Sequence, residues 1–157
     1  MTIVLLDLEE TVIDDIKSST ILVERCKQIR EVLETIAPSS VGVFSWALWS
    51  EDEAAAFWES CLRSRIEDHL GIELEQSYVW SMEGVRNTIA SITSSKHLLV
   101  EDLFDMFGKE ECLNLLFRKG YFTENVVLID DTVSHRLTVE HNGLILVYLN
   151  AKELRDK

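Results

Sequence analysis

The chain has 157 residues, of which 46% are hydrophobic and only one is proline, and its formal net charge is −13. This length and composition are typical of one domain, over residues 1–157, and exclude an extended disordered chain. The acidic surface that this charge implies repels polyanions, which argues against sequence-independent binding to nucleic acid.

No apolar run approaches the roughly 18 residues that span a membrane, and Met1–Leu6 lacks the basic start of a signal peptide. We therefore expect a cytoplasmic protein with no membrane partner. The cysteines, Cys26, Cys61 and Cys112, are widely spaced and have no histidine at metal-ligand spacing. They are expected to be reduced structural thiols rather than zinc ligands or a disulfide framework.

The amino-terminal part of the chain alternates between short apolar runs and one amphipathic segment. Ile3–Leu6 is a continuous apolar run, typical of a strand that is buried on both faces of a parallel sheet. From Leu22 to Ile36 the apolar residues recur every three or four positions, which predicts a helix that ends before Pro38. Val41–Phe44 is expected to be a second buried strand.

The segment Ser50–Glu53 has the pattern of a capping box, which predicts the start of a helix that runs to about Leu70 and stops at Gly71. The third strand has two candidates, "YVW" at Tyr78–Trp80 and "HLLV" at His97–Val100. The second candidate is favoured, with a helix over about Met82–Ile92 before it.

The remaining elements follow the same alternation. Helices are predicted over Met82–Ile92 and Lys109–Lys119, the latter with Gly120 as its stop, and strands over Val126–Ile129 and Leu144–Tyr148. Strands that alternate with helices predict the α/β class, with a doubly wound parallel sheet and helices on both of its faces.

Polar side chains follow three of the predicted strands. Asp7 comes directly after the first strand, Ser45 after the second, and Asp130 with Asp131 after the strand "VVLI". In doubly wound sheets the functional crevice lies outside the carboxyl ends of the strands. We therefore expect these four side chains to meet there.

The ordered set "DLEET", Ser45, Lys109 and "LIDD" resembles the haloacid dehalogenase superfamily of phosphoryl-transfer enzymes, over nearly the whole chain. The first motif of that family is DxDx(T/V), and "DLEETVI" is most similar to the DLDETL form of the phosphatases that act on the RNA polymerase II tail. The second motif is a Ser or Thr, matched by Ser45. The third is a lysine ahead of a helix, matched by Lys109, 21 residues before Asp130. The fourth is a strand that ends in paired acids, matched by "VVLIDD".

The resemblance implies a phosphatase in which Asp7 attacks phosphorus and forms an aspartyl-phosphate, which divides one difficult hydrolysis into two easier steps. Ser45 and Lys109 would bind the phosphoryl oxygens and neutralise the charge that develops on them. Lys96 is the alternative to Lys109 in this role. Glu9 stands where the family has an acid–base Asp.

The resemblance also implies Mg²⁺, held by Asp7, Asp130, Asp131 and the main-chain carbonyl of Glu9. A carboxylate nucleophile cannot approach an anionic phosphate unless a cation lies between them, and Mg²⁺ binds through a few carboxylates, waters and phosphate oxygens. The carbonyl ligand at Glu9 survives the change from Asp to Glu.

The carboxyl group of Glu9, in contrast, lies one methylene further out than that of Asp, and a misplacement of about 1 Å can reduce a rate on the order of 100-fold. Glu9 is consistent either with a slower or adapted phosphatase or with a catalytically impaired binding or regulatory module on the same fold. A phosphorelay receiver domain is a third candidate, but receivers carry their paired acids after the first strand. The neighbouring acids Glu10, Asp14 and Asp15 are expected to be solvated or helix-capping residues.

The family distinguishes substrates partly by cap domains inserted between its motifs. The segments before Ser45 and before Lys109 are barely longer than the core elements require, so no sizeable cap domain is expected. An open site implies an accessible phosphoester, with a phosphoprotein or a nucleotide favoured over a nucleic-acid end because the surface is acidic. Thr11, Trp46 and Trp49 are candidates to line the substrate cleft, although core packing is an equal alternative for the two tryptophans.

Overall fold

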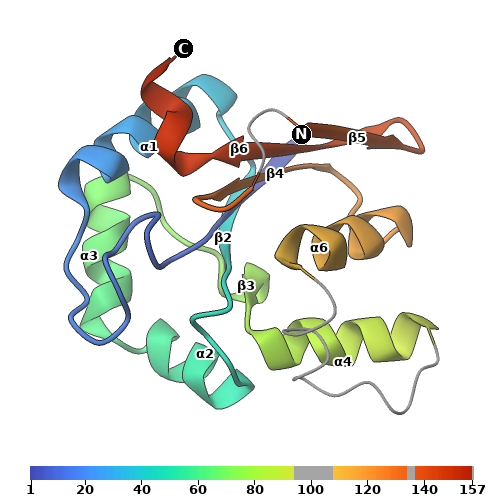
Figure 1. Ribbon diagram of the computed structural model, residues 1–157, viewed down its shortest axis with the longest axis horizontal. Helices are drawn as coiled ribbons and strands as arrows, with labels where there is room; N and C mark the ends of the chain where they lie inside the picture. Colours follow the sequence, from blue (N-terminus) through green and yellow to red (C-terminus); the bar gives the residue numbers. More distant parts are fainter. Residues whose placement is uncertain (94–107, 134–136, 157) are drawn as a thin grey trace.

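The computed structural model describes residues 1–93, 108–133 and 137–156, and these form an α/β fold around one mostly parallel sheet (Figure 1). The described part of the sheet has six strands in the order β3-β2-β1-β4-β6-β5. The strands are β1 (Thr2–Leu6), β2 (Ser40–Phe44), β3 (Val79–Trp80), β4 (Asn125–Asp130), β5 (Leu137–His141) and β6 (Leu144–Asn150). All neighbouring pairs are parallel except β5 with β6.

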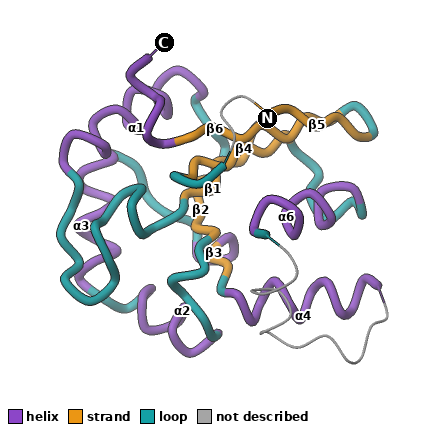
Figure 2. Tube along the Cα trace, in the orientation of Figure 1, coloured by secondary structure: helices purple, strands orange, loops and turns teal. Residues whose placement is uncertain are grey.

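Helices cover both faces of this sheet, as the sequence predicts (Figures 1 and 2). They are α1 (Val23–Ile36), α2 (Glu51–Trp58), α3 (Cys61–Leu70), α4 (Met82–Thr93) and α6 (Lys109–Arg118), with short 3₁₀ helices η1 (Gln76–Tyr78) and η2 (Ala151–Asp156). The chain order of the strands reverses at β1, because β2 and β3 lie on one side of it and β4 on the other. This reversal makes the gap between the ends of β1 and β4 the expected ligand site.

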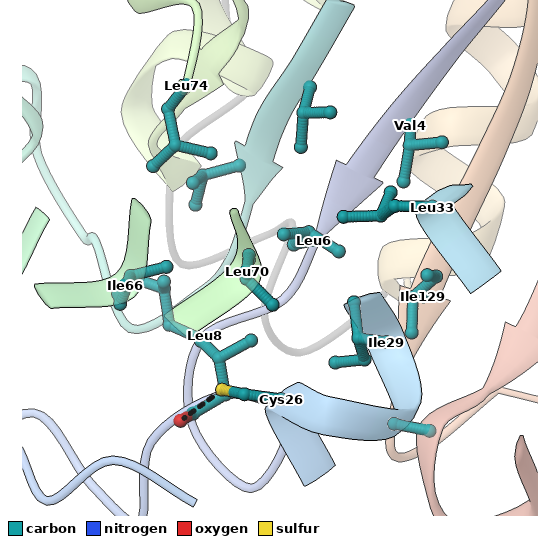
Figure 3. Packing of buried hydrophobic residues seen from close by; sticks show 14 of the residues in the cluster. Val4, Leu6, Leu8, Cys26, Ile29, Leu33, Ile66, Leu70, Leu74 and Ile129 are labelled. Atoms are coloured by element: carbon teal, nitrogen blue, oxygen red, sulfur yellow. Dashed lines mark hydrogen bonds between the residues drawn. The ribbon is translucent and has the colours of Figure 1, made fainter. Parts of the chain in front are cut away.

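The alternation of side chains along β1 divides the core into two layers. Val4 and Leu6 belong to the layer under α1 and α3, whereas Ile3 and Leu5 belong to the layer under α4 and α6. Figure 3 shows Val4 and Leu6 with their partners in the first layer. Full burial of each such side chain contributes about 1.5–3 kcal/mol, which explains why this strand reads as a continuous apolar run.

The single helix predicted from the capping box to Leu70 is wrong, because the structure has two helices there. The capping box itself is confirmed, with Ser50 and Glu53 each accepting from the other's backbone N–H. α2 ends at Trp58, and Ser60 adopts extended backbone angles before α3 begins. The Ser60 hydroxyl donates to the carbonyl of Phe57 at 2.6 Å, so a local side-chain bond replaces the helical one.

Two strands differ from the prediction. β3 occupies Val79–Trp80, which was the less favoured candidate, and His97–Val100 lies outside the described residues. β5 was not predicted, and it makes the sheet mixed rather than wholly parallel. It joins β6 through Asn142 and Gly143, with φ of 52° and 80°, the left-handed pair that a type I′ hairpin turn requires.

The cysteines behave as predicted. Cys26 and Cys112 are buried, Cys61 is exposed, and all three are free thiols. Burial raises the pKa of Cys26 to about 11 and that of Cys112 to about 12, so both remain protonated at neutral pH. Among the helices that the structure describes, none combines the length and the apolar character needed to cross a bilayer.

Gly42 on β2 provides a test of this packing. A Cβ atom there would collide with the backbone carbonyl of Tyr78 and would lie 2.5 Å from its Cβ. Gly42→Ala is therefore expected to lower the free energy of unfolding by about 2 kcal/mol or more. Gly108→Ala is the control, because its Cβ would meet nothing closer than 3.7 Å, and it should cost less than about 1 kcal/mol. Urea unfolding measures both, and equal losses would contradict the predicted contact.

Candidate functional site

Three charged side chains meet where the chain order of the sheet reverses. Asp7 directly follows β1, and its N–H donates to the carbonyl of Ile129 at 3.0 Å, which continues the pairing with β4. Asp130 is the last residue of β4. The ammonium group of Lys109 lies between them, with its Nζ 2.8 Å from Asp7 Oδ1 and 2.5 Å from Asp130 Oδ2. The structure thus brings together the predicted nucleophile, lysine and acidic strand end.

The position of Lys109 depends on how α6 is held against the sheet. Lys109 is the first residue of α6, and the buried side chains of Leu113 and Leu116 anchor that helix in the core layer that it covers. The hydroxyl of Tyr148, on β6, donates to the carbonyl of Glu110 at 2.9 Å. These contacts fix the first turn of α6 at the site, where its backbone N–H groups favour an anion.

Thr11 and Ser45 support Asp7 from two sides. Both side chains are fully buried, and the Thr11 hydroxyl donates to Asp7 Oδ2 at 3.3 Å. A hydrogen bond from Ser45 favours the ionised form of Asp7, while Ser45 Oγ also accepts from the N–H of Ala47 at 3.2 Å. Thr11, which was predicted as a substrate-lining residue, therefore lies against the nucleophile itself.

Two further residues orient the acids and were missed in the sequence. Thr132 donates to Asp130 Oδ1 through both its N–H and its hydroxyl, each at 2.8 Å. The amide of Asn150 donates to the carbonyls of Asp131 and Val133. A Thr two residues after an Asp is a signal for a turn of this kind, and Asn150 lies beside Asp130 in the sheet register.

The carboxylates of Asp7, Asp130 and Asp131 form a compact acidic cluster. Each offers one oxygen, and these oxygens lie within 4.8 Å of one another. Among the described residues, Lys109 is the one cation that bonds to these acids, so the described part of the fully ionised group carries an excess of negative charge. Carboxylate oxygens converging at this spacing fit a hard divalent cation such as Mg²⁺, whose ligands lie at about 2.1 Å.

The surroundings of Asp7 and Asp130 push their pKa values in opposite directions. Burial raises the pKa of Asp7 to about 7. Lys109 acts in the opposite direction and lowers this pKa, whereas the nearby charge of Asp130 raises it. Burial also acts on Asp130, but Lys109 and the two bonds from Thr132 outweigh it and hold its pKa below the usual value. Burial lowers the pKa of Lys109, but the two carboxylates of Asp7 and Asp130 raise it by more, so that its pKa lies above the usual value. Asp130 is therefore the permanently charged acid and Asp7 the one that exchanges its proton near neutrality.

Glu9 is not one of the three acids of the acidic cluster. Its carboxylate accepts a hydrogen bond from the N–H of Ile16 at 2.7 Å, in the loop 14–20 that follows β1 (Figure 2). Arg65 of α3 donates to the carbonyl of Ser19 in the same loop at 3.1 Å. Glu9 therefore holds this loop in the structure, and its predicted roles as acid–base and as carbonyl ligand stay predictions.

The neighbouring acids have structural roles within that loop. Asp14 accepts from the N–H groups of Asp15 and Thr20 and from the hydroxyl of Ser18. These bonds, with Ser18 the largest, hold the pKa of Asp14 below its usual value. Asp15 in turn accepts from the N–H of Ser18 at 2.8 Å. The exposed acids that follow Glu9 therefore stabilise a turn and lie outside the acidic cluster.

The two tryptophans after Ser45 separate in the structure. Trp46 is half-buried and packs its ring against Phe44, with centroids 5.5 Å apart, so it contributes to the core. Trp49 is 40% exposed. Lys96, the alternative to Lys109, lies outside the described residues.

The raised pKa of Asp7 predicts a pH dependence of stability. The folded state holds the Asp7 proton more tightly than the unfolded chain, so the stability that this carboxyl contributes is complete below about pH 4 and is lost as the pH rises to about 7. In EDTA, the melting temperature of Asp7→Asn should therefore rise relative to wild type between pH 4.5 and 8. In Lys109→Met, which keeps Asp7, the same loss of stability should occur at higher pH, because no ammonium group then lowers the pKa of Asp7. If the difference in melting temperature between Asp7→Asn and wild type does not change with pH, the raised pKa of Asp7 is contradicted.

Comparisons with known proteins found no match: no protein-family model, no curated protein and no solved structure is similar to this chain. The assignment of a function therefore depends on the geometry of Asp7, Lys109, Asp130 and Asp131.

Proposed function

We propose that the protein is a Mg²⁺-dependent phosphatase that acts through an aspartyl-phosphate on Asp7. The observation that carries the proposal is the contact of Lys109 with both Asp7 and Asp130 at the reversal point of the sheet. A buried carboxylate, a fixed ammonium group and a second acid in one place are the components that phosphoryl transfer to a carboxylate needs.

In the first step an oxygen of Asp7 attacks phosphorus, the ester P–O bond breaks, and the leaving oxygen takes up a proton. In the second step water attacks the aspartyl-phosphate, which releases phosphate and restores the carboxylate. Lys109, with Nζ 2.8 Å from Asp7 Oδ1, would neutralise the charge on the transferring group. Ser45 and the first N–H groups of α6 would contribute further hydrogen bonds to the phosphoryl oxygens.

The metal would be held by one oxygen each from Asp7, Asp130 and Asp131, the set whose ligand atoms converge within 4.8 Å. When bound, Mg²⁺ supplies the positive charge that lets an anionic phosphate approach a carboxylate. Thr132 and Asn150 would keep the acids in place, because they bond to Asp130 and to the backbone of Asp131.

Proton transfer to the leaving group is assigned to Glu9. This role requires the Glu9 side chain to change its position. The carboxylate bonds to Ile16 N–H at 2.7 Å, so it must leave this partner before it can reach the leaving oxygen. The same contact favours a second candidate function, a catalytically impaired binding or regulatory module in which Glu9 serves only to hold the loop 14–20.

The proposal includes an open, capless site of the haloacid dehalogenase type in a cytoplasmic protein. The described chain has one helix, α1, between β1 and β2, and α2, α3 and α4 after β2. These helices pack on the sheet as parts of its two core layers. A site flanked only by such elements would accept an accessible phosphoester, with a phosphoprotein or nucleotide favoured over a nucleic-acid end because of the net charge of −13.

Binding of Mg²⁺ is expected to stabilise the protein. For a Kd of about 1 mM, 10 mM Mg²⁺ adds about 1.4 kcal/mol and raises the melting temperature by roughly 3–6 °C. The shift should be larger at pH 8 than at pH 6, because the Asp7 proton, with a pKa of about 7, competes with the metal.

A thermal-shift series with Asp131→Asn and the control Asp52→Asn, an exposed acid on α2, measures this. Asp131→Asn should lose most of the shift and Asp52→Asn should keep it. No shift in wild type at either pH would show that the acidic cluster does not bind Mg²⁺.

Turnover is expected with 4-nitrophenyl phosphate and Mg²⁺, and Asp7→Asn should abolish it. Glu9→Gln tests the acid–base role more cleanly than Glu9→Asp, because the Gln amide oxygen can still accept from Ile16 N–H but cannot transfer a proton. If Glu9 protonates the leaving group, kcat should fall on the order of 100-fold for an alkyl phosphate and far less for 4-nitrophenyl phosphate.

Each negative outcome has a distinct meaning. If the rates of wild type match the Asp7→Asn background for aryl, nucleotide and phosphopeptide esters, the phosphatase proposal fails in favour of the binding module. A stable phosphoprotein formed from acetyl phosphate, with no turnover, would instead indicate a receiver-like phosphorelay protein.

A further inference from the structure

An apolar groove lies between the loop 14–20 and the helices α2 and α3. Its volume is about 300 Å³, and one wall is formed by Ile16 and Ser19 of the loop. The opposite wall is formed by Ala47, Leu48 and side chains of the two helices, among them Ala56, Phe57 and Leu62. In Figure 1 the loop that follows β1 passes beside α3, and the bond from Arg65 to Ser19 joins the two.

The groove adjoins the proposed phosphoryl site, because residues of each wall bond to a residue at or near the strand ends that carry that site. Ala47 donates its N–H to Ser45 Oγ at 3.2 Å, and Leu48 N–H donates to the carbonyl of Ser45. On the other wall, the N–H of Ile16 bonds to Glu9, two residues beyond Asp7. One wall of the groove is thus bonded directly to Ser45, and the other is bonded to Glu9, two residues beyond Asp7.

The walls of the groove are fixed before any ligand binds. The loop is held by Glu9 and Arg65 from the body of the protein. Phe57 and Leu48 are 4% and 2% exposed and belong to the same core layer as Leu8, the residue after Asp7. A preformed apolar pocket beside a polar reaction site is the usual form of a small-molecule subsite.

The charges around the groove restrict what it can accept. Glu53 is the one charged residue among the described residues that line it, and its carboxylate accepts from the N–H groups of Trp49 and Ser50. Because no cation lines the groove among the described residues and Glu53 does, a leaving group that carries further phosphates, such as a nucleoside diphosphate, would be repelled. An uncharged apolar group would instead displace water from Ile16, which is exposed.

We propose that this groove binds the apolar leaving group of a small phosphomonoester, an aryl or alkyl alcohol rather than a nucleoside diphosphate. The proposal rests on the phosphatase function proposed above, and it replaces the phosphoprotein or nucleotide favoured there with a small ester as the substrate of that same site. Binding energy from the apolar group would place the ester oxygen next to Asp7 and Glu9.

The test uses Ala56, an exposed residue of α2 that lines the groove, and its exposed neighbour Ala55, which does not line it. Ala56→Phe fills the groove from its solvent side, so the core needs no rearrangement, and Ala55→Phe is the matched control. The substrates are 1-naphthyl phosphate, which has a bulky apolar leaving group, and acetyl phosphate, whose leaving group is small.

For Ala56→Phe, kcat/KM should fall by about tenfold or more with 1-naphthyl phosphate and change by less than about twofold with acetyl phosphate. Ala55→Phe should change neither. A measurement that does not depend on turnover is fluorescence titration with 1-naphthol. Saturable binding that Ala56→Phe weakens by about tenfold or more, and Ala55→Phe does not, supports the groove as its site.

The outcomes separate the two proposals. Turnover of both esters with no selective effect of Ala56→Phe overturns the groove and leaves the phosphatase standing. Binding of 1-naphthol that depends on Ala56, with no turnover of either ester, overturns the phosphatase and the leaving-group role together, and leaves only an apolar ligand site. A wild-type dimer that Ala56→Phe dissociates, seen by sedimentation velocity, would show that a second copy covers the groove and would also overturn the proposal.

Discussion

One ammonium group holds two buried carboxylates at the point where the chain order of the sheet reverses. Asp7 and Asp130 are 5% and 0% exposed, and Lys109 bonds to both. Removing an ionised group from water costs several kcal/mol unless a partner compensates it, and the lysine is the partner that both acids share at their strand ends. The alignment of α6, the hydroxyl of Tyr148 and the turn at Thr132 all serve to keep this arrangement in place.

The lysine compensates the two acids unequally, and the inequality gives them different properties. Asp130 has two additional donors from Thr132, whereas Asp7 has the longer bond from Thr11 and the contribution of Ser45. A carboxylate with a pKa near 7 is partly ionised at neutral pH and can then act as a nucleophile. Its negative charge is poorly compensated, however, unless a cation binds beside it. In the proposed function, this poor compensation is the reason why metal binding and catalysis would depend on the same side chain.

The sequence predicts those features of the fold that follow from local patterns. Ile3–Leu6 is apolar at every position because both faces of β1 are covered, and that pattern identifies a central strand. The acids at strand ends could be placed together because parallel strands end at one edge. The "HNG" segment before Leu144 was a readable hairpin signal, and it would have identified β5. The break at Ser60 depends on a hydroxyl that bonds to a single carbonyl, and the helical period of the apolar residues does not show it.

The direction of side chains is harder to predict than their position in the chain. Glu9 stands two residues from Asp7, yet its carboxylate bonds to Ile16, which lies in a loop that no periodic pattern describes. Asn150 contributes to the site through contacts that depend on the register between β4 and β6. Such contacts arise from tertiary structure, so a single sequence indicates the candidate residues but not their partners.

The edge strands of the described sheet also affect how readily the chain could associate through them. An apolar sheet whose edge strands are long and flat can template the addition of further chains, which leads to aggregates. In the described sheet one edge is β3, which has only two residues, and the other is β5, which carries the exposed charge of Glu140. The most apolar strands, β1 and β4, lie at the centre of the sheet, away from both edges. The strands of high aggregation propensity therefore lie in the core, where they position the acids at their ends. They are not offered to a neighbouring molecule.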